Sequence, residues 1–239
     1  MIARFLGAIQ FLTVAPVRRS TASPGDSALF FPVIGAALGA AGAVVLRLSA
    51  EVFPQNVAAL IVLSFWALIT GGLHEDGFAD VADAFRAGRA REKIFIILKD
   101  SRIGAHGALA LILISLLRWQ ALSSITVNPV FPVAAIFAVS RASLVLLAWV
   151  APPAGTGLGF EFSRALNSGV AIAVAIQAIV WAFFSGAGML LLWGTFVIIV
   201  IARRYFMRRI GGVTGDCLGA TCLIVETWGL ILFTCRRCM

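Results

Sequence analysis

The sequence predicts an all-α, polytopic integral membrane protein with about seven transmembrane helices and an amphipathic surface helix. Of its 239 residues, 61 % are hydrophobic and only 13 % are charged, whereas soluble domains average about 45–50 % and 25 %. Apolar runs of about 20 residues, enough to cross a bilayer, recur along the chain. The 18 Phe and 6 Trp residues suit lipid contact and interfacial anchoring.

The N-terminal run, MIARFLGAIQFLTVAPV, superficially resembles a signal peptide because a basic residue precedes an apolar stretch. No small-x-small cleavage site follows, and Arg18 and Arg19 lie on the wrong side of the stretch for export. We therefore expect this segment to stay attached as a helix that lies in the interface or re-enters the membrane.

The spans follow from the apolar runs in chain order. Small residues in the first run, 29–48, permit close packing with another helix. Residues 169–202 contain no charge over 34 positions. One helix of that length would extend about 51 Å, so we predict a hairpin of two short spans that turns at 185–188. The expected spans are 29–48, 57–73, 103–122, 130–150, the two halves of 169–202, and 217–234.

Three polar segments separate these spans. The longest, 76–102, contains EKIFIIL at 92–98, a pattern that predicts an amphipathic helix on the membrane surface. Residues 151–168 form a Gly/Pro-rich loop, and residues 203–216 form a basic loop. Threading the spans from a cytoplasmic N-terminus places all three segments in the cytoplasm, where Lys and Arg concentrate. We predict a multi-pass protein of the cell (inner) membrane whose polar motifs face the cytoplasm.

The formal net charge of +8 raises the question of a nucleic-acid partner. Of the 19 basic residues, 17 are Arg, and most lie in the short gaps between apolar runs. This pattern is typical of cytoplasmic loops, and no basic stripe with interleaved aromatic residues is present. The sequence therefore predicts the lipid bilayer as a partner and excludes nucleic acid.

Acidic residues are concentrated in the motif GGLHEDGFADVADAF. Asp76, Asp80 and Asp83 have the spacing i, i+4, i+7, which on a helix places them within about 60° of one another. Like charges on one face repel in a low dielectric, and Mg²⁺, which binds carboxylates and substrate phosphates, would stabilise them. The alternative is a solvated acidic face, although the surrounding Gly, Ala and Val are unusual for one. His74 and Glu75 project away from this face.

A second polar patch reads KDSRIGAHG. Lys99 and Arg102 are three positions apart, which predicts that they share one helix face, with Ser101 between them. Their cations suit phosphate oxygens, but they could instead pair with the acids or with lipid headgroups. Beside three aspartates, phosphate binding is the stronger interpretation.

A third patch reads IGGVTGDCLGA. Its paired glycines, followed by Thr214, Gly215 and Asp216, resemble a turn whose main-chain N–H groups contact phosphate. Gly-rich turns are common, and an Asp at a helix start is most often an N-cap. A capping residue can also bind metal, so Asp216 remains a candidate ligand.

Arg141 and Glu226 fall within apolar spans, where a charged side chain usually faces a cavity or a partner. We expect Arg141 to line a cavity and contact phosphate, and Glu226 to pair with a basic group. Acids and bases around a phosphate-sized site predict metal-assisted phosphoryl transfer. The cysteines match no zinc spacing and no His accompanies them, so we interpret them as incidental buried thiols: Cys217, Cys222, Cys235 and Cys238.

These motifs, in this order, resemble those of the cobalamin synthase family, the adenosylcobinamide-GDP ribazoletransferases. GGLHEDGFADVADAF is similar to that family's GG-x-H-x-DG-x-ADT-x-DG signature, and DSRIGAHGALALI to its DSR-x-G-x-HG segment. FFPVIGAALGA, the pair Ser140-Arg141 and GGVTGDCLGA also match in position and spacing. The resemblance covers essentially the whole chain. Ala84 replaces a Gly of the signature, and Leu223 replaces an acid, which leaves Glu226 without an assigned role.

The resemblance implies that residues 1–239 form a single transmembrane catalytic domain. A hydroxyl of α-ribazole, or of its 5′-phosphate, would attack the diphosphate of adenosylcobinamide-GDP, GMP would leave, and Mg²⁺ would be required. His106 or an aspartate would take the hydroxyl proton. The metal ligands implied in this chain are Asp76, Asp80, Asp83 and Asp216, and the phosphate-binding residues are Lys99, Ser101, Arg102, Arg141, Thr214 and Gly215.

Two other classes are weighed against this one. A CDP-alcohol phosphotransferase also uses clustered aspartates, but its D-x-x-D-G-x-x-A-R signature is absent. A proton- or metal-coupled transporter would place acids near the midplane, whereas these cluster at one edge. The sequence leaves open the preferred ribazole form, the general base and assembly into a homo-oligomer.

Overall fold

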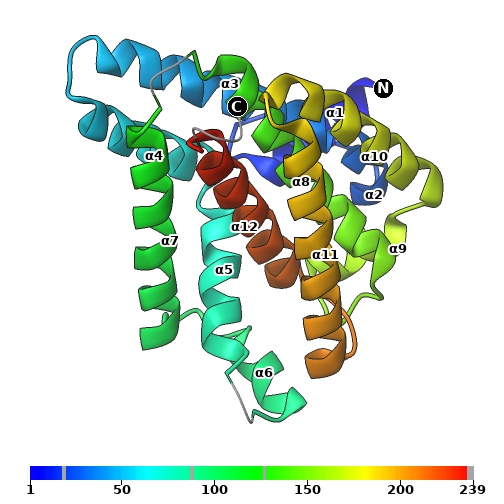
Figure 1. The fold of residues 1–239 in the computed structure, drawn as a ribbon. Coiled ribbons are helices and arrows are strands. Elements are labelled where there is room, and N and C mark those ends of the chain that lie inside the picture. The colour runs from blue at the N-terminus through cyan, green and yellow to red at the C-terminus, as the bar shows by residue number, and fades with distance from the viewer. Residues whose placement is uncertain (18–19, 87–88, 126–127, 236–239) are drawn as a thin grey trace.

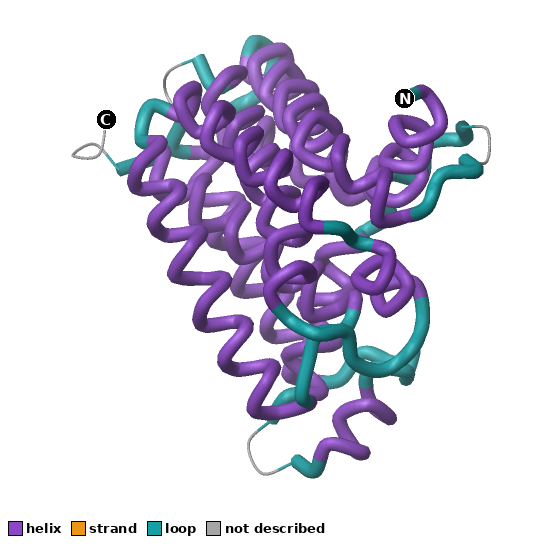
Figure 2. The backbone as a smooth tube through the Cα atoms, turned by 90° about the vertical axis from the view of Figure 1, so that its right-hand side faces the viewer, coloured by secondary structure: helices purple, strands orange, loops and turns teal. Residues whose placement is uncertain are grey.

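In a computed structural model of the chain, residues 1–17, 20–86, 89–125 and 128–235 are described. Their regular secondary structure is entirely helical (Figures 1 and 2), which confirms the predicted all-α class. The predictions made for Arg18, Arg19 and Cys238 lie outside the described residues.

Twelve α-helices and two short 3-10 turns make up the described parts of the chain. They are α1 (Ile2–Leu12), α2 (Pro24–Ser27), η1 (Ala28–Phe30), α3 (Phe31–Ala50), α4 (Gln55–Thr70), α5 (Leu73–Ala84), α6 (Arg91–Ile97), α7 (Ala105–Ser123), α8 (Val130–Val150), α9 (Leu158–Ala165), α10 (Ser168–Ala182), η2 (Phe183–Ser185), α11 (Gly188–Ile210) and α12 (Gly215–Phe233). Among the described residues, six helical segments are long and apolar enough to cross a membrane, or seven if the bent pair α4–α5 is one span. The predicted number is confirmed.

Each expected span corresponds to a helix. Residues 130–150 coincide with α8, and the hairpin predicted at 169–202 is α10 and α11, joined through η2 and Gly186. Gly186 has a φ of 78°, a conformation that favours glycine. The amphipathic helix predicted at 92–98 is α6. The remaining four spans, α3, α4, α7 and α12, lie within one to three residues of their predicted ends.

Two predicted loops are wrong. The basic loop expected at 203–216 is mostly helical, because α11 continues to Ile210 and ends at Gly211, whose φ is 75°. Arg and Met are good helix formers, and no Gly or Pro interrupts them before Gly211. The loop expected at 151–168 contains α9, which has Glu161 in its first turn and Arg164 in its last, an arrangement that complements the helix dipole.

The centre of the molecule is formed by α8 and α12. In each, 78 % of the most apolar 18-residue stretch is buried, against 28 % for α7 and 22 % for α11. Helix α3 packs closely along α8 because it has glycines at the contact. A Cβ at Gly39 would lie 2.5 Å from the carbonyl oxygen of Val133, and one at Gly35 would lie 2.5 Å from that of Phe137. The small residues predicted to allow close packing therefore do so.

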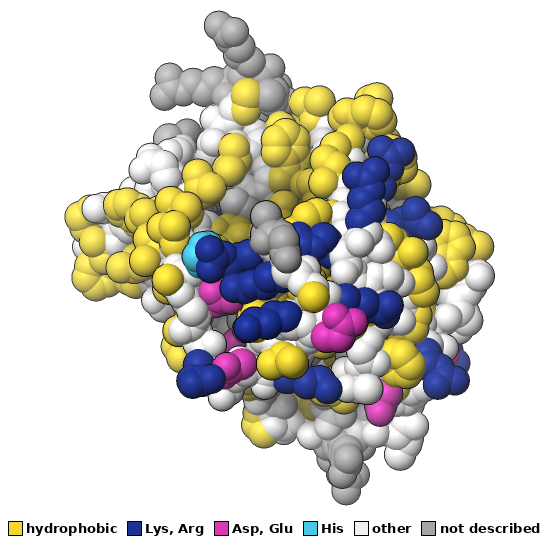
Figure 3. All heavy atoms as spheres, turned by 90° about the horizontal axis from the view of Figure 1, so that it is seen from below, with side chains coloured by type: hydrophobic (Ala, Val, Ile, Leu, Met, Phe, Trp, Pro, Cys, Tyr) yellow, Lys and Arg dark blue, Asp and Glu magenta, His cyan; other side chains and the backbone are white. Residues whose placement is uncertain are grey.

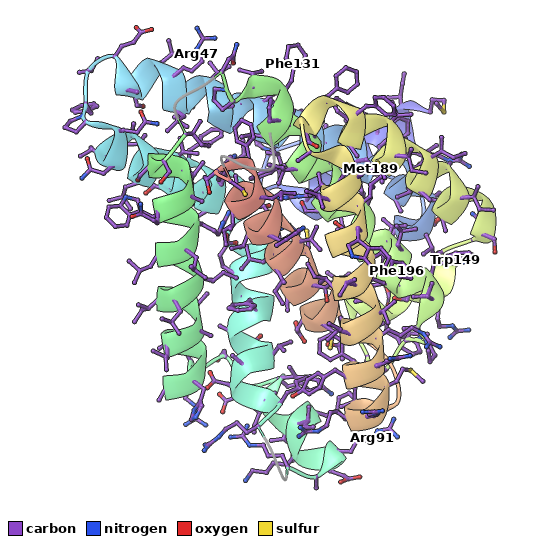
Figure 4. The ribbon with its side chains drawn as sticks, viewed as in Figure 1. Arg47, Arg91, Phe131, Trp149, Met189 and Phe196 are labelled. Atoms are coloured by element: carbon purple, nitrogen blue, oxygen red, sulfur yellow. The ribbon has the colours of Figure 1, made fainter. Side chains whose placement is uncertain are left out.

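The outer helices expose apolar side chains to the surroundings. Met189 and Phe196 point away from the bundle on α11 (Figure 4). Contiguous apolar surface of this kind marks contact with a membrane. Other exposed apolar residues lie on α7 and α10, namely Leu109, Ile112, Leu113, Leu116, Leu117, Ile172, Ile176 and Ile179.

Basic side chains gather at the end of the bundle near α6 and the C-terminal end of α11, and Figure 3 shows this face directly. Arg91 lies at this end and Arg47 at the opposite end (Figure 4). We call this end the basic face; its exposed members include Arg86, Arg91, Lys93, Lys99, Arg203, Arg204 and Arg208.

Candidate active site

The acidic motif forms α5, which begins at a sharp turn. Gly71 and Gly72 have φ values of 65° and 68°, a left-handed conformation that residues with a Cβ rarely adopt. Helix α4 ends there, and the chain turns by 90° into α5. The paired glycines therefore direct α5 along the bundle, beside α7 and α12 (Figure 1).

A close backbone contact brings α5 against the first turn of α12. A Cβ at Gly77 would lie 3.0 Å from Cα of Asp216 and 3.1 Å from its carbonyl oxygen, closer than ordinary van der Waals contact. One turn further along α12, a Cβ at Gly219 would lie 3.6 Å from Cα of His74. These glycines allow the carboxylates of the two helices to approach one another.

Four carboxylates meet where α5 and α12 cross. Asp80 interacts electrostatically with Asp76, Asp83 and Asp216, and Asp216 also interacts with Asp76. In the described residues, no Lys or Arg forms an ion pair with any of the four. We call Asp76, Asp80 and Asp216 the acidic corner. Its negative charge is not neutralised by neighbouring side chains.

Asp83 differs from the other three because its carboxylate has a partner in the fold. The main-chain N–H of Gly104, the residue before α7, donates to Asp83 Oδ2 at 2.7 Å. Cβ atoms at Gly104 and Gly107 would lie 2.4 and 2.3 Å from this carboxylate, so both glycines make room for it. Asp83 therefore fixes the start of α7 to α5, a role that its helical spacing did not predict.

A cavity of about 760 Å³ opens beside the acidic corner. Asp76 and Asp216 line it, together with Lys99, Thr214 and Gly215. Other lining residues come from α1 and the following segment, which we call the α1 wall, and from the loop before α9 and the first turn of α9. They are Gly7, Gln10, Phe11, Ser20, Ala22, Pro24, Ser27, Gly155, Thr156, Leu158 and Gly159. The volume is within the range of about 300–1,000 Å³ typical of small-molecule sites.

The loop before α9 and the turn before α12, which both line this site, are hydrogen-bonded to each other. The N–H of Ala154 donates to the carbonyl of Val213 at 2.8 Å, and the N–H of Val213 donates to that of Pro152 at 2.9 Å. Gly159 approaches so closely that a Cβ on it would lie 2.4 Å from the nitrogen of Gly215. The Gly/Pro-rich segment thus fixes the turn that precedes α12.

The N-cap of α12 is Thr214, so the prediction that Asp216 caps this helix is wrong. Thr214 Oγ1 accepts the N–H of Cys217 at 3.4 Å and donates to Asp216 Oδ2 at 3.2 Å. Asp216 lies in the first turn, where the helix dipole favours negative charge. Its carboxylate is held at the edge of the cavity and does not close the helix end.

Lys99 and Arg102 do not share a helix face as predicted. Helix α6 ends at Ile97 and α7 begins at Ala105, so both residues lie in the connection, where helical spacing does not apply. Lys99 lines the cavity. Arg102 is exposed, and its guanidinium makes forked hydrogen bonds to Asp100 at 2.9 and 2.8 Å, which lower the pKa of Asp100 to about 2.

Three further candidates lie away from the cavity wall. Ser101 and His106 are exposed, and neither lines the cavity. Arg141 is buried and pairs with Glu226, so the expectation that it lines a cavity is not met. The sequence-predicted residues that the structure brings together are therefore Asp76, Asp80 and Asp216 with Lys99, Thr214 and Gly215.

Arg141 belongs to a network of four charged side chains from four helices. Arg118 of α7 binds Glu75 of α5 at 2.8 Å and also Glu226 of α12. Arg141 of α8 donates to Glu226 and, at 2.8 Å, to the hydroxyl of Ser140. We call Glu75, Arg118, Arg141 and Glu226 the charge network. Its two positive and two negative charges balance, and the predicted pairing of Glu226 with a basic group is confirmed.

The sequence did not lead us to predict the role of Arg118 or the contribution of α1 to the cavity wall. Arg118 is a lone charge inside an apolar span, the same signal that singled out Arg141 and Glu226. The α1 residues carry no chemical motif, and only the fold reveals that they face Asp76. Of the cysteines, Cys217 and Cys222 are buried free thiols on α12, as predicted, whereas Cys235 is only partly buried, so the prediction of a buried thiol is wrong there.

The predicted aspartates do not form a complete metal site on their own. In the described parts of the chain, no three His, Cys, Asp or Glu side chains are arranged to hold one ion. Asp76, Asp80 and Asp83 therefore do not form a complete ligand set by themselves, and Asp83 is engaged by Gly104.

Comparison with known proteins gives a consistent result. A family model described as cobalamin-5-phosphate synthase matches residues 4–234. An adenosylcobinamide-GDP ribazoletransferase of Bradyrhizobium diazoefficiens is 40 % identical over 225 residues, covering 89 % of this chain and 86 % of the relative. Proteins of the same name from Clostridium tetani (33 % identical, 97 % and 96 % covered) and Ralstonia pickettii (36 % identical, 94 % and 93 % covered) are also similar.

No solved structure matches the chain, so the assignment depends on sequence similarity over nearly the full length. The family match spans every helix that contributes to the acidic corner, the cavity and the charge network. The chain therefore belongs to the cobalamin-5-phosphate synthase family.

Proposed function

We propose that this protein is an adenosylcobinamide-GDP ribazoletransferase that joins α-ribazole, or its 5′-phosphate, to adenosylcobinamide-GDP and releases GMP. Membership of the family and the shared name of three relatives support the reaction. The structural observation that carries it is the acidic corner, an unneutralised group of carboxylates beside a cavity that also holds Lys99. Such a site suits a diphosphate bound with a cation.

Mg²⁺ is the proposed cofactor, and the chemistry of the donors supports it. The acidic corner offers carboxylate oxygens without a thiolate or imidazole, a set that suits hard cations. Because no three described acidic side chains hold an ion alone, one or two carboxylates would bind it and the substrate diphosphate and water would complete the shell, the usual arrangement for Mg²⁺. Bound in this way, Mg²⁺ neutralises charge on the diphosphate.

The chain's own residues then perform a phosphoryl transfer. A ribose hydroxyl attacks the phosphorus atom on the corrinoid side, its new P–O bond forms, the bond to GMP breaks, and the hydroxyl proton is released. Asp76, which lines the cavity, accepts this proton in preference to His106, which does not line it. Lys99 holds the diphosphate and offsets charge on the departing GMP, and the N-terminal end of α12 at Thr214 and Gly215 orients phosphate oxygens.

The reaction is proposed to occur on the cytoplasmic side of the cell (inner) membrane. The basic face lies at the same end of the bundle as Lys99, and positively charged segments are retained in the cytoplasm. Self-association into a homo-oligomer remains a prediction, which the mass of the purified protein in detergent would test.

The test is GMP release by the purified protein supplied with adenosylcobinamide-GDP, α-ribazole and Mg²⁺. We expect GMP and the cobalamin product in equal amounts, loss of both on chelation, and recovery on adding Mg²⁺. Asp76→Asn should lower kcat by about 100-fold or more, the size of effect seen when a group acting in the transition state is removed. Glu51→Gln, at the other end of the bundle near Arg47, is the matched control.

Two results would contradict the proposal. Release of GMP without a requirement for ribazole would indicate hydrolysis instead of transfer. Movement of a solute across liposomes with no GMP released would favour a transporter.

A further inference from the structure

The cavity beside the acidic corner has a wall of apolar and aromatic side chains. Phe11 of α1 and Phe95 of α6 line it. The other apolar lining residues are Leu73, Leu98, Leu144, Leu158 and Leu218. Among the lining residues, full charges come only from Asp76, Lys99 and Asp216. A ligand that fills the cavity must therefore combine an apolar body with a polar group that reaches the acidic corner.

The ring of Phe11 is held in place by two buried aromatic residues. It packs against Phe31 at a centroid distance of 5.2 Å and against Phe162 at 5.4 Å. Phe31 and Phe162 stack on each other at 5.6 Å with their planes 5° apart, and both are fully buried. Phe11 therefore presents a rigid surface to the cavity, which an aromatic ligand can contact with little loss of side-chain entropy.

The ring of Phe95 packs against Gly155, a position that a residue with a Cβ could occupy only with strain. A Cβ at Gly155 would lie 3.1 Å from the ring of Phe95, and Gly155 has a φ of 75°. The guanidinium of Arg91 lies over the same ring at 5.8 Å. The loop that carries Gly155 is thus shaped around a second aromatic surface in the cavity.

On the α1 wall, the fold uses the hydroxyls of Ser20 and Ser27 and the side-chain carbonyl of Gln10, which leaves the amide N–H groups of Gln10 available. The Ser20 hydroxyl donates to the carbonyl of Ala3 at 2.6 Å, and the Ser27 hydroxyl donates to that of Ser23 at 2.9 Å. The side-chain carbonyl of Gln10 accepts the N–H of Ser20 at 2.8 Å. The edge donors of a guanine base on this wall would meet only oxygens that the fold already engages, which opposes binding. A dimethylbenzimidazole has no edge donor, and its one free ring nitrogen is the single polar group that needs a partner.

The size of the cavity excludes the corrin ring and admits a nucleoside. A cavity of about 760 Å³ accommodates a drug-sized ligand. A nucleoside is of that size, whereas a corrin ring carrying GDP is several times larger and must remain largely outside.

We propose that this cavity is the acceptor site, in which the benzimidazole of α-ribazole lies against Phe11 and Phe95 and a ribose hydroxyl reaches Asp76. The corrin ring then stays outside, and the diphosphate of the corrinoid substrate reaches the acidic corner at the part of the cavity lined by Lys99, Thr214 and Gly215. This inference rests on the proposed function and deepens it, because it assigns one of the two substrates to a defined set of residues.

The test separates the two Michaelis constants. Phe11→Ala should raise KM for α-ribazole about tenfold, because one aromatic contact to a base is lost, and should leave KM for adenosylcobinamide-GDP unchanged. Leu158→Ala should act in the same direction more weakly. Its side chain is 72 % exposed, so folding is preserved. Phe5→Ala is the matched control, because Phe5 is on the same helix but packs on Phe30 at 5.6 Å outside the cavity.

Direct binding provides the second measurement. In equilibrium dialysis without a corrinoid, the unaltered protein should bind α-ribazole, Phe11→Ala should bind it about tenfold more weakly, and GMP should not compete. A rise in KM for the corrinoid substrate alone, or displacement of α-ribazole by GMP, would overturn the inference and assign the cavity to guanosine. Failure of the proposed function has a different signature, since the unaltered protein would then release no GMP whether or not it binds α-ribazole.

Discussion

Lys99 and Arg102 illustrate how one residue's position decides its function. They belong to one short motif, and both were predicted to bind phosphate. The structure places Lys99 on the cavity wall, whereas the guanidinium of Arg102 is bound to Asp100, with its side chain 86 % exposed. An exposed ion pair of this kind contributes little to stability, and its cation is directed at a neighbour instead of at the acidic corner.

We therefore expect unequal effects when the two cations are removed. Lys99→Ala should raise KM for adenosylcobinamide-GDP about tenfold or more, the loss expected for a hydrogen bond to a charged phosphate. Arg102→Ala should change KM by less than about twofold, as for other exposed ion pairs. Steady-state GMP release measures both. Equal losses would show that Arg102 leaves Asp100 to bind substrate.

For single residues, the sequence predicted which side chains carry the chemistry better than it predicted which atoms they contact. The spacing of Asp76, Asp80 and Asp83 correctly placed them on one helix, because helical periodicity is local. It did not predict that Asp83 binds the N–H of Gly104, since that contact depends on how α5 packs on α7. The cap of α12 was misassigned because Thr214 and Asp216, two positions apart, both suit a helix start.

The packing of α5 on α12 depends on single glycines. Gly77→Ala should destabilise the protein by about 1–3 kcal/mol, the usual range for overpacking, because its Cβ would meet the backbone of Asp216 at 3.0 Å. The same displacement should separate Asp76 from Asp216 and reduce GMP release. Thermal unfolding in detergent and turnover measure the two effects.

A glycine elsewhere provides the control for this prediction. Gly169→Ala, in the first turn of α10, places a Cβ 3.3 Å from the side chain of Asn167 and near nothing else. Its stability should change by less than about 0.5 kcal/mol. Equal stability of the two variants would show that α5 and α12 can move apart freely.

The charge network should couple four helices energetically. Arg118→Met leaves three charges with a net of −1 and should cost about 3–5 kcal/mol, as for other broken buried pairs. Arg118→Met combined with Glu75→Gln leaves only Arg141 and Glu226, which balance. The double variant should therefore be more stable than the single variant, and a double-mutant cycle in detergent measures the coupling. Additive losses would contradict a shared network.

The presence of each membrane-spanning helix was largely predictable from the sequence, but the residues at which helices end were not always predictable. Long apolar runs define α3, α7, α8 and α12 because burial in lipid or in the protein interior dictates their composition. The extension of α11 to Ile210 was missed because charge was taken as the end of the helix, although the stop signal is Gly211. On the extended turn, Tyr205 and Arg209 bind the carbonyl of Phe85 at 2.8 and 3.2 Å, which anchors the end of α5.

The whole molecule has one end rich in Lys and Arg, and this asymmetry predicts its orientation. In a background without the native cysteines, Arg91→Cys should react with an impermeant maleimide only from the cytoplasmic side. Arg47→Cys, at the opposite end (Figure 4), should react only from the other side. Labelling of intact cells and of inverted vesicles measures both. The reverse pattern would place the acidic corner outside the cytoplasm.

The class of fold and the number of spans followed from composition alone, but the site as a whole did not. The α1 wall of the cavity, including Phe11, is far in sequence from Asp76 and carries no motif. Its contribution depends on the path of the chain from α1 through α2 into α3, which no local pattern specifies. The sequence thus located the phosphate chemistry and left the proposed acceptor pocket to be found in three dimensions.

The charge network also constrains how the protein is made. Arg118 can meet Glu75, which is synthesised earlier, but Arg141 has to wait for Glu226 on the last helix. Until then, a lone arginine at the centre of a lipid-inserted helix costs about 2.5–3.5 kcal/mol. The charge of Arg141 is therefore paired only after the final helix has left the ribosome. A chain truncated before Glu226 would keep an unpaired Arg141 in the bilayer, which cellular quality control could recognise.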